Sequence, residues 1–152
     1  MSATYQKNPG WINGLLKRYQ SISEKVIAVG FPAGKCQAYP DGEEVAQVAY
    51  DNVNGIGCPV RDFMAYADYG IRKSTAPLLS AIAQQTNLGN NNAVDALQEA
   101  AGLAGAQAIK SAIIEGDYIP NSPVTIAKKG SSKPLIDTGH LVQTATYAVR
   151  NK

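Results

Sequence analysis

The chain has 152 residues and a formal net charge of +2, with 45% of its residues hydrophobic and 17% charged, and it contains two cysteines and one histidine. This length predicts one domain, residues 1–152, that buries enough surface to fold without a disulfide framework or a structural metal. So small a net charge does not indicate nucleic-acid binding. The polar start predicts no secretion signal, and no apolar run approaches the roughly 20 residues that a membrane span needs. The low charge content weakly favours a surface that is covered in part by other molecules.

Residues 1–25 are predicted to form an N-terminal extension that ends in an amphipathic helix. From Trp11 to Lys25 the apolar side chains recur at three- and four-residue intervals, which is typical of a helix. The β-branched run at residues 26–31 predicts a strand in the middle of a sheet, and the Tyr-Pro-Asp-Gly sequence at residues 39–42 predicts a tight turn. Residues 45–50 fit either a strand or a short helix.

The middle of the chain predicts a strand at residues 60–66 and then two helices. The first helix covers residues 69–85, with a kink or a new start at Pro77. The second covers residues 92–115, with Asn92 as its N-cap and Gly116 as its stop. Small residues, among them Gly102 and Gly105, line this second helix and let another backbone come close. Tight packing on the protein's own sheet is the simplest explanation for them.

The C-terminal part predicts a long interaction loop, residues 118–140, followed by a strand. Within the loop, Ser122 and Pro123 fit the N-cap and first residue of a short helix that ends before Gly130. We expect residues 118–138 to lie against another chain or over the domain's own sheet, because long loops are usually functional. Residues 141–150 alternate in polarity like a strand. The predicted fold class is therefore α+β, a small antiparallel sheet packed against a long α-helix and shorter helices.

Residues with chemical potential are few. A Ser–His–acid triad would need His140, which follows a Thr-Gly turn where an exposed structural histidine is more common, and Cys36 and Cys58 are too few and scattered for a zinc site. The carboxylates beside the turn at residues 39–42 fit a divalent-cation site, but a solvated turn is the simpler interpretation. We expect no catalysis, no cofactor and no metal.

A basic patch in the loop leaves one alternative open. Lys128, Lys129 and Lys133, together with Lys17 and Arg18, could form a nucleic-acid-binding surface. The three loop lysines could equally pair with acidic residues on a neighbouring subunit.

Several short segments, taken in order, carry a resemblance to a known family. They lie at residues 26–35, 39–42, 45–46, 52–55, 58–64, 119–130 and 133–141. Their order and spacing resemble those of the tail-completion and virion-morphogenesis proteins of long-tailed bacteriophages. The specific part is C-terminal, where residues 122–130 fit S-P-x-T-I-x-x-K-G and residues 134–141 fit P-L-I-D-T-G-x-L. The chain departs from the family at Val53-Asn54, where Glu-Phe is usual, and at Asp62, where Pro is usual.

The resemblance implies a non-enzymatic ring subunit at the head–tail junction of a virion, assembled in the bacterial host cytoplasm. The implied partners are copies of itself and other neck, connector, tail-terminator or tail-tube proteins, with no membrane and with nucleic acid only as the genome passing along the lumen. The implied structural and interaction residues are Arg61, Phe63, Pro123, Thr125, Lys129, Gly130, Pro134, Leu135, Ile136, Asp137, Thr138 and Gly139.

Residues 134–139 are interpreted as a structural staple, an anchored turn that positions the start of the final strand. We expect Leu135 or Ile136 to be buried as an anchor, Asp137 to accept a hydrogen bond from the backbone of Thr138 or Gly139, and Gly139 to adopt a positive φ. The rival interpretation makes Asp137 and His140 an acid–base pair.

Overall fold

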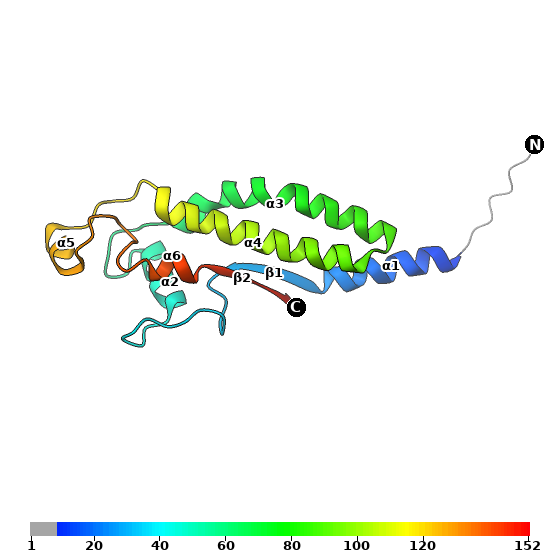
Figure 1. Ribbon diagram of the computed structural model, residues 1–152, viewed down its shortest axis with the longest axis horizontal. Coiled ribbons are helices and arrows are strands. Elements are labelled where there is room, and N and C mark those ends of the chain that lie inside the picture. The colour runs from blue at the N-terminus through cyan, green and yellow to red at the C-terminus, as the bar shows by residue number, and fades with distance from the viewer. Residues whose placement is uncertain (1–8) are drawn as a thin grey trace, which may run out of the picture.

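Two long antiparallel helices form the body of the molecule in the computed structural model, which describes residues 9–152 (Figure 1). They are α3 (Phe63–Leu88), which continues through Pro77, and α4 (Asn91–Glu115). Gly89 ends α3 with a φ of 75°, and the Asn90 side chain caps α4 by accepting a hydrogen bond from Ala93 N at 3.3 Å. The helix at 92–115 is confirmed, but its predicted N-cap, Asn92, is wrong by two residues because Asn90 already makes the cap.

One face of α4 carries the sheet. Strands β1 (Lys25–Gly30) and β2 (Thr146–Asn151) pair antiparallel, with Val29 opposite Tyr147. A Cβ added at Gly102 would overlap the Tyr147 ring, and one at Gly105 would lie 2.8 Å from Val29 Cγ1. The small residues of α4 therefore let the sheet approach its backbone, and the predicted α+β fold is confirmed.

Three predictions about strands are wrong. The sheet has only two strands within residues 9–152, so β1 is an edge strand and not a central one. Residues 60–66 form no strand, because Asp62 caps α3 by accepting from Ala65 N at 2.8 Å and Phe63 begins the helix. Residues 140–144 form a short helix, α6 (His140–Thr144), before β2 begins. Leu141 and Ala145 are both buried while Gln143 between them is exposed, which fits a helix and not a strand, because a strand would place all three on one face.

The main hydrophobic core lies at the end of the body where α3 begins and α4 finishes. Helix α2 (Val45–Asn54), from the segment that also fitted a strand, contributes Val45 and Ala49. The other fully packed members come from α3, α4, α6 and the residue after α6, and they are Phe63, Ala67, Ile109, Ala112, Ile113, Leu141 and Ala145. Phe63 is the largest of them and is completely buried.

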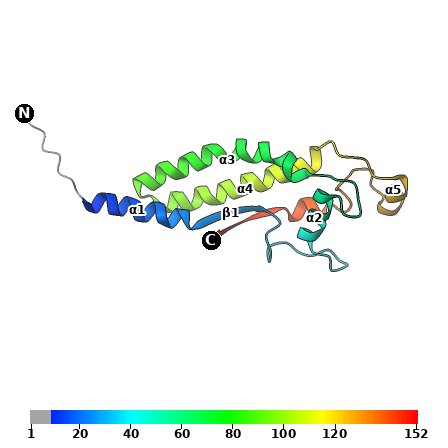
Figure 2. The same cartoon turned by 180° about the vertical axis from the view of Figure 1, so that it is seen from behind.

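Two elements extend the molecule at opposite ends. Helix α1 (Pro9–Ser23) projects past the closed end of the α3–α4 pair, and α5 (Pro123–Lys129) lies at the other end (Figures 1 and 2). Arg18 holds α1 in place by donating from Nη1 to the carbonyl oxygens of Thr86, at 3.1 Å, and Asn87, at 2.9 Å. The start of the predicted N-terminal extension, residues 1–8, lies outside the described residues. None of the described helices is long and apolar enough to span a membrane.

Candidate interaction surface

Arg61 fixes the position of the loop that leaves α4. Its side chain is only 7% exposed, donating from Nε to Ile119 O at 3.2 Å and from Nη2 to Asn121 Oδ1 at 2.9 Å. No carboxylate of the described chain forms an ion pair with it. Arg61 is therefore a buried cation whose neutral oxygen partners both come from residues 119–121. The sequence places Arg61 and Phe63 among the structural and interaction residues, and the structure places Phe63 in the core.

Asn121 joins the two ends of residues 121–133, the segment that contains α5 and is called the excursion. Its Nδ2 atom donates to Ser131 O at 3.4 Å and Lys133 O at 3.3 Å, while its Oδ1 atom accepts from Arg61. Residues 121 and 131–133, the entry and the exit of the excursion, are thereby joined. Sequence reasoning missed Asn121, and no local signal marks it.

Helix α5 is confirmed as predicted. Ser122 Oγ accepts from Thr125 N at 3.2 Å, Pro123 occupies the first turn, and Gly130 ends the helix with a φ of 72°. Pro123, Thr125 and Gly130 thus have local structural roles. One of the two predicted positions of this loop, over the domain's own sheet, is wrong. The excursion lies at the far end of the molecule (Figure 1). Its contact with another chain stays a prediction.

The staple at residues 134–139 is confirmed in part. Leu135 and Ile136 are half-buried against the main core, and Gly139 adopts a φ of 80° immediately before α6. Pro134 and Leu135 form a turn in which Leu135 has a φ of 62°, a conformation that is uncommon for a side chain of this size. The predicted hydrogen bond from the backbone of Thr138 or Gly139 to Asp137 is wrong, since none is present within residues 9–152. The staple leads into α6 and only then into β2.

A cavity of about 260 Å³ lies between the staple and the turn at residues 39–42. Residues from five of the segments that carry the resemblance line it, and they include Tyr39, Asp41, Asn52, Arg61, Lys129, Leu135, Asp137, Thr138 and His140. Burial raises the pKa of Tyr39, and the negative charges of Asp137, Asp41 and Glu43 raise it further. The cavity therefore collects carboxylates and cations from parts of the chain that are far apart in sequence.

His140 is held at the edge of this cavity as part of the structure. Its Nε2 atom lies 2.8 Å from Gln37 O and must donate, since a carbonyl oxygen only accepts. The imidazole ring also packs against Tyr39, with ring centroids 4.5 Å apart. Among residues 9–152, no group of three or more His, Cys, Asp or Glu side chains is arranged to hold a metal ion. Asp41 instead accepts a hydrogen bond from Glu43 N at 3.2 Å within the turn.

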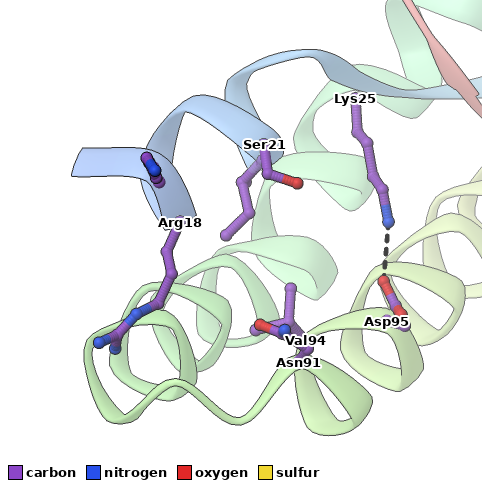
Figure 3. Close-up of a pocket in the computed structure, with 8 residues that line it drawn as sticks. Arg18, Ser21, Lys25, Asn91, Val94 and Asp95 are labelled. Atoms are coloured by element: carbon purple, nitrogen blue, oxygen red, sulfur yellow. Dashed lines mark hydrogen bonds and ion pairs between the residues drawn. The ribbon is translucent and has the colours of Figure 1, made fainter. Parts of the chain in front are cut away.

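The basic residues do not form one surface. Lys17 and Arg18 line a second cavity, of about 340 Å³, between α1 and the start of α4, where Lys25 Nζ pairs with Asp95 Oδ1 at 2.7 Å (Figure 3). Lys128 and Lys129 lie in the last turn of α5, at the opposite end of the molecule (Figure 1). The five cations considered for nucleic-acid binding are therefore divided between the two ends.

Large apolar side chains are exposed along the whole molecule. Trp11 is 62% exposed and Leu16 55% exposed on α1, where the helix has passed the end of the body. Others lie on α3, on α4, on the loop after α4 and on α5, and they include Tyr66, Tyr69, Leu79, Leu88, Leu103, Ile119 and Val124. Singly exposed apolar side chains are common on monomeric proteins, and these leave apolar surface accessible along the molecule.

Comparison with known protein families, characterised proteins and solved structures finds no match for this chain. The resemblance to phage tail-completion proteins therefore depends on the segments quoted above and on the positions of these segments in the folded structure.

Proposed function

We propose that this chain is a non-enzymatic structural subunit of a tailed-bacteriophage virion, which forms a ring with copies of itself at the head–tail junction and completes the tail. Its further partners are other neck, connector, tail-terminator or tail-tube proteins. The genome passes along the lumen of the ring.

The observation that carries this proposal is the meeting of the quoted segments at one end of the molecule. The cavity beside the staple takes residues from the turn at 39–42, from α2, from the segment just before α3, from α5 and from residues 135–141. Segments that resemble one family and meet in space fit a single structural unit. Its side chains are occupied with helix caps, turns and hydrogen bonds to backbone carbonyls, which suits a protein that is used for its shape.

The exposed apolar side chains are compatible with the same function. A subunit of a closed ring contacts a neighbour on each side through two different surfaces, so a large share of its surface is covered after assembly. Trp11 on α1 and Val124 on α5, at 62% and 66% exposed, lie at the two ends of this elongated molecule, where contacts with other virion proteins are expected.

The alternative, a nucleic-acid-binding module, has weaker support because Lys17 and Arg18 lie far from Lys128, Lys129 and Lys133. Binding to duplex DNA measured at several salt concentrations tests it. The alternative gains if affinity falls steeply with salt and if alanine at the three loop lysines abolishes binding.

Deletion of the gene from the phage or prophage that carries it tests the main proposal. Electron microscopy of the lysate should show filled heads and separate tails that have not joined. A plasmid copy of the wild type or of His140→Ala should restore joined particles, whereas a copy with Gly139→Ala should restore fewer. Joined particles at the normal frequency after deletion would overturn the proposal.

A further inference from the structure

The two-stranded sheet has two free edges. Lys152 N donates to Glu24 O at 2.7 Å, which continues the register in which Lys25 lies opposite Asn151. Hydrogen-bonded and non-hydrogen-bonded pairs alternate in an antiparallel ladder. Val26 and Ala28 therefore bond across to β2, whereas the residues between them turn their backbone groups outward. The outward residues are Lys25, Ile27 and Val29 on β1, and Tyr147, Val149 and Asn151 on β2.

These outward N–H and C=O groups have no hydrogen-bond partner in the part of the chain that the structure describes. Apart from Gly30, no residue of either strand is fully buried. Within residues 9–152, only α4 lies over the sheet, and it covers one face and neither edge (Figures 1 and 2). Both rows of outward backbone groups are consequently open to another strand.

Neither edge carries the features that usually prevent such pairing. Natural edge strands are protected by proline, by charged side chains, by a bulge or by a covering loop. The strand sequences are KVIAVG and TYAVRN, the six residue pairs run without a bulge, and the charged residues lie only near the strand ends. The central residues of both edges, Ile27, Val29, Tyr147 and Val149, are apolar or aromatic, which favours strand addition.

We infer that β1 of one copy pairs antiparallel with β2 of the neighbouring copy, so that the sheet continues from subunit to subunit; this inference rests on the ring of the proposed function. A second copy fits best because one chain supplies both halves of the contact. Each edge offers three outward residues at the same two-residue spacing, and neighbours placed by rotation bring β1 and β2 together in opposite directions. Each added copy leaves one edge of each kind free for the next, until the ring closes and no edge remains.

Hydrogen exchange on the full chain tests the inference by comparing dilute, monomeric protein with assembled protein. The outward amides of Ile27, Val29, Tyr147 and Val149 should exchange on the order of 100-fold more slowly after assembly. The inward amides of Ala28 and Ala148 should be protected in both states and serve as the internal reference. Slow exchange of the outward amides already in the monomer, or only after another protein is added, would assign the edge to a different strand and overturn the inference.

A proline variant with a matched control tests the same contact by mass. Val149→Pro removes an outward N–H and costs no bond within the chain's own ladder, whereas Val149→Ala loses a similar side chain and keeps the N–H. We expect Val149→Ala to assemble like the wild type and Val149→Pro to assemble at least about 10-fold more weakly in native mass spectrometry. Ile27→Pro against Ile27→Ala repeats the test on the other edge if Val149→Pro does not fold.

The two proposals can fail separately. Assembly of both proline variants at wild-type strength would overturn the edge pairing and leave the ring standing. A wild-type chain that stays monomeric at every concentration would overturn both the ring and the pairing.

Discussion

Arg61 and Asn121 are joined by a hydrogen bond of 2.9 Å from Nη2 to Oδ1, although they lie 60 residues apart in the chain. The bond links the start of α3 to the excursion that carries α5. Because Asn121 also donates to Ser131 O and Lys133 O, one side chain connects the buried cation to both ends of the excursion. The position of α5 on the molecule therefore depends on this pair.

Replacing Asn121 by alanine should lower the free energy of unfolding by about 1–3 kcal/mol, because it leaves a buried charged donor without its acceptor. Urea denaturation measures the change. Asn121→Asp is the control, since its carboxylate still accepts from Arg61 but donates nothing to Ser131 or Lys133. We expect Asn121→Asp to be the more stable of the two variants and both to be cleaved faster by protease within residues 122–133. Equal stability of the two variants would show that the bond to Arg61 contributes little.

Gly102→Ala should destabilise the protein although alanine favours helix. The added Cβ would overlap the Tyr147 ring, and overpacking of this kind costs about 1–3 kcal/mol, against a gain in helix propensity of about 1 kcal/mol. Gly14→Ala on α1 is the matched control, because a Cβ there meets only Arg18 Nη2, at 4.0 Å. Thermal unfolding should show a lower Tm for Gly102→Ala and an unchanged or higher Tm for Gly14→Ala. An unchanged Tm for Gly102→Ala would mean that the sheet is not pressed against α4.

The sequence predicts the fold well where local chemistry determines the structure. The long apolar stripe of α4 and the Ser122, Pro123 and Gly130 signals of α5 act within a few residues, and both helices form as expected. The predictions fail where burial decides between two patterns. Residues 141–145 alternate like a strand, but the segment is helical, which buries Leu141 and Ala145 in the core and leaves Gln143 between them exposed.

The candidate site is less predictable because its contacts join distant segments. Lys129, Leu135, Asp137 and Thr138 could be singled out from their motif, but nothing in one sequence shows that they meet Tyr39 at one cavity. The role of Asn121 has the same origin, since its partners lie 60 residues before it and about ten after it. Fold class follows from patterns along the chain, whereas such contacts follow only from the folded packing.

Substitutions in the staple should separate a structural role from a chemical one. Gly139→Ala places a Cβ on a residue with a φ of 80° and should cost about 1–2 kcal/mol of stability, although the Cβ itself would make only an ordinary contact, 3.5 Å from Gln143 Nε2. Leu135→Ala removes half-buried packing against the core and should also lower stability. His140→Ala should cost at most about 1 kcal/mol, the usual value of one hydrogen bond. Urea denaturation and native mass spectrometry measure stability and assembly. A folded, assembled His140→Ala variant without function would favour the acid–base interpretation of Asp137 and His140.

Tyr118 should make the stability of the protein depend on pH above pH 10. Its hydroxyl donates to Ala112 O at 2.6 Å, and burial, with smaller effects of Tyr66 and Asp62, raises its pKa from 10 to about 12. The folded state thus favours neutral tyrosine, so this contribution is fully present below the unfolded pKa near 10 and is lost as the pH rises from 10 through 12. We expect Tyr118→Phe to be less stable than the wild type at pH 8 by about 1 kcal/mol, the value of the lost hydrogen bond.

The difference between the two proteins should shrink steadily between pH 10 and pH 12, because the ionised hydroxyl no longer donates to Ala112. Urea denaturation at each pH measures it, and an absorbance titration at the tyrosinate band should lose its step near pH 12 in the variant. Tyr66→Phe is the control, since Tyr66 packs edge-on against Tyr118 with ring centroids 6.1 Å apart, and no hydrogen bond of its hydroxyl is present within residues 9–152. It should keep the stability of the wild type at pH 8. A constant difference between the wild type and Tyr118→Phe across this pH range would mean that the hydroxyl is not held on the end of α4.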